Sequence, residues 1–166
     1  YGGSILFLFE PDETPDSFKQ FLSRYAVAIG DGEATDIASF VAPSPTFIQV
    51  KKSNSQLPPH PVTEGFEVLY MPGATHFGWS VDPQSLPLVN DNTPLVSQRI
   101  LASTTINSWA ETDPDTLEFD VNSEIGGPLP LAVVIEAVGE VTGGVYSDGE
   151  ELTTVNMIVI GDTDFA

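Results

Sequence analysis

Two nearly continuous apolar runs lie near the two ends of the chain, at residues 5–9 and 155–160. The later run is rich in β-branched side chains, and each run is too short for a buried helix, so both predict strands that are covered on both faces. A third apolar segment, residues 129–138, is interrupted by Glu136, which indicates that one face there meets solvent or a polar neighbour. Buried strands of this kind are typical of layered α/β sheets.

One segment after the first apolar run has the periodicity of an amphipathic helix. Its apolar side chains recur at intervals of three and four residues, at Phe18, Phe21, Leu22 and Tyr25. We expect Thr14 to cap this helix, Pro15 to be its first residue and Gly30 to end it. The spacing predicts that the aromatic stripe packs on a sheet and does not form a cofactor face.

The rest of the chain predicts short strands separated by loops. The expected extended segments lie around residues 34–41, 47–51, 66–71 and 99–103. Loops are expected at the proline-rich residues 53–63, at residues 82–94, and at the glycine- and acid-rich residues 141–154, which have the pattern of a hairpin-like connection.

Both terminal apolar runs end in acidic segments. Glu10 and Asp12 follow the first run, and Asp162 and Asp164 follow the last one. Ligands of open α/β sheets bind outside the carboxyl ends of the strands, so if the two strands are parallel neighbours, these four carboxylates converge and raise one another's pKa. We therefore expect a polar, partly open crevice that docks a ligand or a partner, with no metal bound by the protein alone. The alternative is that Asp162 or Asp164 caps a following helix.

Composition narrows the classes of partner. The chain has 166 residues, and five Lys plus Arg against 24 Asp plus Glu give a net charge of −19, which repels nucleic acid and anionic lipid surfaces. The complete absence of Cys excludes disulfides, thiolate zinc sites and a cysteine nucleophile. Neither half differs enough in composition to require a boundary, so residues 1–166 are predicted to form one domain.

The common catalytic motifs are missing from the sequence. Residues 78–82 lack the second glycine of a serine-nucleophile elbow, no glycine-rich phosphate loop with Lys is present, and neither His60 nor His76 belongs to a zinc-binding pair on a helix. The chain is therefore predicted to be no enzyme and to need no cofactor. Two alternatives remain open: a divalent-cation-dependent hydrolase or transferase that uses the acidic loops, and a carbohydrate-binding module that uses Trp79 and Trp109.

The order of several segments resembles a known family. The segments are GGSILFLFEPDE, FKQFLSRYAVAIGDGEATD, PPHPVTEGFEVLYMPGATHF, INSWAE, PLAVVIEAVGE and VNMIVIGDTDFA. Together they resemble the auxiliary domain of uncharacterised ABC-type transport systems, the gliding-motility (GldG-like) family that is related to an intraflagellar transport domain. The resemblance implies an α/β fold similar to flavodoxin and to class I glutamine amidotransferases, with a layered, mostly parallel, strand-rich sheet.

The same resemblance implies a location and a set of partners. It implies an extracytoplasmic domain, anchored by transmembrane segments outside this chain, that works beside an ABC permease and an ATPase. The chain begins at Tyr1 without Met, so we expect it to be a fragment of a longer membrane-anchored protein, truncated at both ends of the fold. The leading interpretation is a non-catalytic binding or assembly domain of an ABC-type transport system.

Overall fold

Strands dominate the fold. The computed structural model describes residues 3–11, 13–80, 88–90, 93–94, 96–113, 115–138 and 154–164. Within these residues the chain forms thirteen strands, one α-helix and one 3₁₀ helix. The elements are β1 (Gly3–Leu8), α1 (Asp16–Ser23), β2 (Val27–Ile29), β3 (Glu33–Asp36), β4 (Phe40–Val41), β5 (Ser44–Lys51), η1 (Lys52–Asn54), β6 (Val68–Pro72), β7 (Phe77–Trp79), β8 (Leu88–Asn90), β9 (Thr93–Pro94), β10 (Val96–Ser103), β11 (Ser108–Glu111), β12 (Pro130–Val138) and β13 (Thr154–Ile160).

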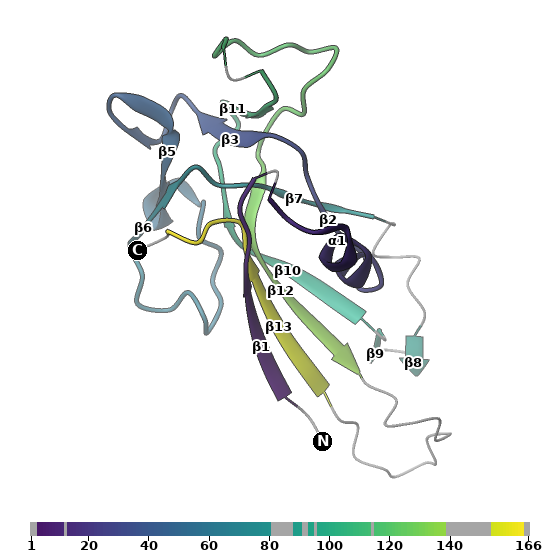
Figure 1. Ribbon diagram of the computed structural model, residues 1–166. Coiled ribbons are helices and arrows are strands. Elements are labelled where there is room, and N and C mark those ends of the chain that lie inside the picture. Colours follow the sequence, from purple (N-terminus) through teal and green to yellow (C-terminus); the bar gives the residue numbers. More distant parts are fainter. Residues whose placement is uncertain are drawn as a thin grey trace.

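The largest sheet has four strands in the order β1-β13-β12-β10 (Figure 1). β1 and β13 are parallel, with Ile5 opposite Met157, whereas β13, β12 and β10 are joined by antiparallel pairs. The first and the last strand of the described residues are therefore parallel neighbours, which is the condition on which the candidate site depends.

β12 lies at the centre of the core because both of its faces are covered. Val133, Ile135 and Ala137 belong to one cluster of buried side chains, together with Leu22 of α1. Ala132 and Val134 belong to a second cluster on the opposite face, which includes Ile48, Val50 and Met71 from β5 and β6. Alternate residues of one strand thus supply two cores. Glu136 is half-buried and accepts a hydrogen bond from Ser97 Oγ at 3.3 Å, which confirms that a polar neighbour meets it.

β1 differs from β12 in that most of its surface is exposed. Ile5, Leu6 and Leu8 are 45%, 55% and 38% exposed, respectively, and β1 is the terminal strand of the sheet. β13 lies between β1 and β12, and its Met157 and Val159 are fully buried. The prediction that both terminal runs are covered on both faces is therefore wrong for β1, which is a partly exposed edge strand.

The predicted helix is present but is shorter than expected. Pro15 is the residue that precedes its first turn, and no side chain caps it; Thr14 Oγ1 instead donates to the carbonyl of Glu10 at 3.4 Å. The helix ends at Ser23, and Ala26 turns the chain with a positive φ of 61°. The residues up to Gly30 form β2 instead, in keeping with the strand preference of the β-branched Val27 and Ile29 in that segment.

The other strands form small antiparallel sheets. Their orders are β4-β5-β6, β11-β3, β2-β7 and β8-β9, and all of their pairings are antiparallel. The predicted flavodoxin-like, mostly parallel α/β fold is therefore wrong. A parallel sheet needs a crossover connection between successive strands, usually an α-helix. In the described residues α1 is the single α-helix, and no α-helix joins the strands between residues 33 and 80.

No helix in the described part of the chain combines the length and the apolar character that a membrane span requires.

Candidate functional site

The ends of β1 and β13 bring two of the predicted acidic segments together. Phe9 N–H donates to the Ile160 carbonyl at 2.9 Å, so the parallel pairing continues beyond the strands. One residue further, Thr163 N–H donates to Glu10 Oε1 at 2.9 Å, and the Thr163 hydroxyl donates to the same oxygen. Through Thr163, Glu10 therefore holds the segment that carries Asp162 and Asp164 beside the end of β1. Asp12 lies outside the described residues.

Asp162 is the buried member of this group. Its side chain has no exposed surface, Oδ1 accepts the N–H of Asp164 at 2.6 Å, and Oδ2 has no hydrogen-bond partner among the described residues. Burial, against the lowering effect of the Asp164 N–H and with smaller contributions from the charges of Glu10 and Asp164, raises the pKa of Asp162 to about 6. The neighbouring carboxylates thus contribute to the raised pKa of Asp162, but burial is the larger cause.

The residues around Asp162 hold it in place through the backbone. Gly161 N–H donates to the Leu131 carbonyl at 2.9 Å, and the Gly161 carbonyl accepts Thr75 N–H at 2.6 Å. A Cβ at Gly161 would overlap the Thr75 carbonyl oxygen, so only glycine allows this close approach. The bond from Asp164 N–H back to Asp162 is a local turn of the kind that Asp often makes. Asp162 is therefore a buried residue held by its backbone neighbours, and not a lining residue of a partly open crevice as the sequence analysis expected.

A crevice of about 270 Å³ lies beside these residues, between the end of β1 and the start of α1. Its polar lining includes Glu10, Glu13 and Thr163, and its apolar lining includes Phe7, Phe9 and Phe18. The rings of Phe9 and Phe18 meet edge to face with their centroids 6.0 Å apart. This crevice lies at the edge where the sequence placed one, but it is a different crevice: Glu10 lines it, Asp162 and Asp164 are not among its lining residues, and aromatic rings form much of it.

These aromatic residues were missed as site residues because their spacing predicted a core stripe. Leu22 is the single fully buried residue of α1, whereas Phe18 is 41% exposed. The signal that could have identified them is the presence of two phenylalanines, Phe18 and Phe21, in a helix of only two turns. Because the strand beside them ends the sheet, it cannot cover both rings.

No protein-family model, curated protein or solved structure matches this chain. The likeness to the auxiliary domains of ABC-type transport systems therefore rests on the order of the sequence segments alone.

A divalent-cation site gains no support from the geometry. In the ranges that the structure describes, no three His, Asp or Glu side chains come close enough to hold a metal ion. Glu10 already accepts two hydrogen bonds from Thr163 through one oxygen, and Asp162 is closed off from solvent. The arrangement offers no set of converging oxygen ligands of the kind that Mg²⁺ or Ca²⁺ requires.

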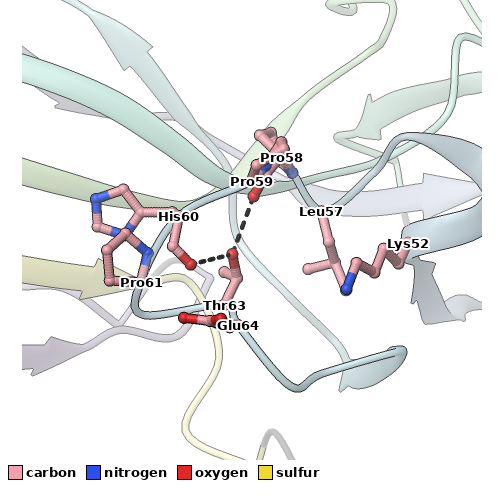
Figure 2. A pocket seen from close by; sticks show the side chains of 8 residues that line it. All are labelled: Lys52, Leu57, Pro58, Pro59, His60, Pro61, Thr63 and Glu64. Atoms are coloured by element: carbon pink, nitrogen blue, oxygen red, sulfur yellow. Dashed lines mark hydrogen bonds between the residues drawn. The ribbon is translucent and has the colours of Figure 1, made fainter.

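A separate pocket, of about 370 Å³, lies at the proline-rich loop that contains His60 (Figure 2). The Thr63 hydroxyl bonds to the carbonyls of Pro58 and His60 and closes this loop. Figure 2 shows the His60 ring and the Lys52 side chain on opposite sides of the loop. His60 Nδ1 accepts the N–H of Val62 at 3.2 Å, and Lys52 pairs with Glu67. The loop therefore brings no acid and base together.

The two tryptophans do not form a shared sugar-binding surface. Trp109 is buried, and its Nε1–H donates to Glu111 Oε2 at 2.9 Å. Trp79 is 38% exposed at the end of β7. The burial of Trp109 therefore leaves the carbohydrate-binding interpretation with one exposed tryptophan ring, that of Trp79.

Proposed function

We propose that this chain is a non-catalytic binding or assembly domain, and that the crevice between β1 and α1 is its docking site. The observation that carries the proposal is the joint lining of this crevice: the carboxylates of Glu10 and Glu13 stand beside the partly exposed ring of Phe18. Apolar rings with a few convergent polar groups are typical of recognition sites.

The partners that we propose are an ABC permease and an ATPase. This part rests on the sequence resemblance, together with an extracytoplasmic location and an anchor outside this chain. Its fold expectation is wrong, so the transporter association needs a test that is independent of the fold. A binding domain of such a system would present a surface to the permease and would need no nucleotide site of its own, in agreement with the missing phosphate-binding loop.

The test is photocrosslinking in the full-length protein, produced in its own cell together with the permease and the ATPase. A photoreactive phenylalanine analogue replaces Phe18 in one version and Phe66 in the other. The two residues are matched controls because they are 41% and 47% exposed, but Phe66 does not line the crevice. We expect crosslinks to the permease or the ATPase from position 18 and none from position 66.

Two results would count against the proposal. Equal crosslinking from both positions would show that the crevice is not the docking site. A specific crosslink from position 18 to an unrelated protein would keep the binding function and overturn the association with ABC subunits. The crosslinked product is identified by mass spectrometry.

A further inference from the structure

β1 leaves one row of its backbone groups facing away from the sheet. Phe9 N–H bonds to β13, and in a parallel ladder the residues that bond to the neighbouring strand alternate. Ile5 and Phe7 therefore also face β13, whereas the N–H and C=O groups of Leu6 and Leu8 point outward. Because β1 ends the strand order of the described sheet, this row is a template for one more strand.

A groove runs beside this edge, between β1 and α1. It consists of two hollows of about 270 Å³ each, and Phe7 of β1 and Phe18 of α1 line both of them. Phe21 lines the first hollow. Glu10 and Glu13 line the second hollow, which is the crevice described above. Alternate side chains of a strand point to the same face and lie about 7 Å apart. Two adjacent hollows along β1 are thus suited to two alternate side chains of an added strand.

The negative charge of Glu10 and Glu13 in the second hollow favours a cationic side chain there. Glu10 uses Oε1 to accept both bonds from Thr163, and its Oε2 accepts no hydrogen bond from the described residues. Glu13 is exposed beside it. A Lys or Arg side chain can pack its apolar stem on the Phe18 ring and bring its charged head to these carboxylates.

We infer that β1 binds an extended segment of a partner protein by β-strand addition, with an apolar side chain in the Phe21 hollow and a Lys or Arg side chain in the hollow of Glu10 and Glu13. This inference rests on the proposed function and specifies the chemistry of its partner. A second copy of the chain is a poor occupant, because each copy carries a net charge of −19 and has only five cationic side chains to offer.

The experiment selects short random peptides by display against the chain. We expect the enriched peptides to alternate apolar residues and to carry Lys or Arg. The best peptide is then titrated against Leu6→Pro and Leu6→Ala. Proline removes the outward N–H without touching the bonds to β13, and such an edge position tolerates it. Alanine keeps the N–H and removes the same side chain. We expect Leu6→Pro to weaken binding about tenfold more than Leu6→Ala does.

A wild-type measurement protects the test against a folding defect in Leu6→Pro. Amide hydrogen exchange is followed by NMR with and without the peptide. The amides of Leu6 and Leu8 are expected to become protected on binding. Unchanged exchange at both amides, equal binding by the two Leu6 variants, or no enrichment of any peptide would overturn strand addition.

The charge requirement has its own matched pair. Glu10→Gln with Glu13→Gln removes two charges at the hollow, and Glu64→Gln with Glu118→Gln removes two exposed charges elsewhere. We expect the first pair alone to weaken binding and to flatten its salt dependence. Equal effects would show that only the net charge matters and would overturn the assigned hollow. Concentration-dependent dimers in sedimentation that Leu6→Pro abolishes would instead identify a second copy as the occupant.

The two proposals fail separately. Crosslinking from position 18 with no effect of Leu6→Pro would leave the docking crevice in place and reject strand addition. Peptide binding that Leu6→Pro abolishes, without crosslinks to ABC subunits, would support strand addition and reject the transporter association.

Discussion

β12 and β1 are both almost continuously apolar in sequence, yet the fold buries the side chains of β12 and leaves most of those of β1 exposed. Ile135 of β12 and Ile5 of β1 lie in the same row of the sheet, because both are opposite Met157. Ile135 is fully buried and Ile5 is 45% exposed. The difference arises because β12 has a neighbour on each side and a core on each face, whereas β1 ends the sheet. An apolar run thus indicates that a strand forms, but not which surface covers it.

The sharpest test of this comparison is the same substitution at the two isoleucines. Ile135→Ala is expected to lower the free energy of unfolding by about 2–5 kcal/mol, because it leaves a cavity in a closed core. Ile5→Ala is expected to cost under about 1 kcal/mol, since much of that side chain already meets solvent. Urea denaturation of both variants measures the difference, and equal losses would show that β1 is covered in solution.

The next test compares two glycines, one at the end of β13 and one at the start of β1. Gly161→Ala places a methyl group against the Thr75 carbonyl oxygen, so a loss of about 2 kcal/mol is expected from the forced backbone shift. Gly3→Ala meets no atom within 4 Å and serves as the control. Thermal unfolding gives both values. A tolerated alanine at Gly161 would mean that Thr75 does not lie against the chain there.

Asp162 predicts a pH dependence at the same end of the sheet. Its pKa is raised from 3.8 to about 6 in the folded chain, so the folded state binds this proton more tightly. The resulting stability is complete below pH 3.8 and is lost as the pH rises through about 6.

Between about pH 5 and about pH 7, we expect wild type to lose about 1 kcal/mol more than Asp162→Asn. Asparagine keeps an oxygen acceptor for Asp164 N–H but does not titrate. Parallel pH profiles of the two proteins, measured by urea unfolding, would show that the Asp162 carboxyl is solvated. Asp164→Asn, at an exposed position, is the control.

The smallest effect is expected at the contact between the two strand ends. Thr163→Val removes the hydroxyl bond to Glu10 and keeps the backbone bond, so the cost is expected to be below about 1 kcal/mol. Thermal unfolding at neutral pH checks this value. A larger loss would indicate that the end of β1 depends on this contact and not on its pairing with β13.

The sequence identified β1 and β13 as strands, and their parallel pairing was the condition on which the candidate site depended. Both are short apolar runs followed by acidic residues, and the parallel arrangement brings Glu10 to Thr163, a contact that the sequence did not indicate. The position of α1 was also predictable from its stripe, but its end was not, because the preference of Val27 and Ile29 for a strand overrides a periodicity that continues to Tyr25.

The sheet class was not predicted, although one signal pointed to it. The segment between the apolar runs at 129–138 and 155–160 has the pattern of a hairpin-like connection, which favours the antiparallel pairing that β12 and β13 make. The burial of Asp162 could not be anticipated. It depends on the close approach of Thr75 to Gly161, a contact between residues that lie far apart in sequence.

The placement of β13 between β1 and β12 also determines when β1 can pair during synthesis of the chain. Glu10 meets Thr163 across 153 residues of chain, and β1 has no strand partner in the described fold other than β13. During synthesis β1 must therefore wait, unpaired, until almost all of this sequence has been made. Contacts of such long sequence separation slow folding. An extended segment that binds the edge of β1 would have to be kept away until β13 has occupied the other side.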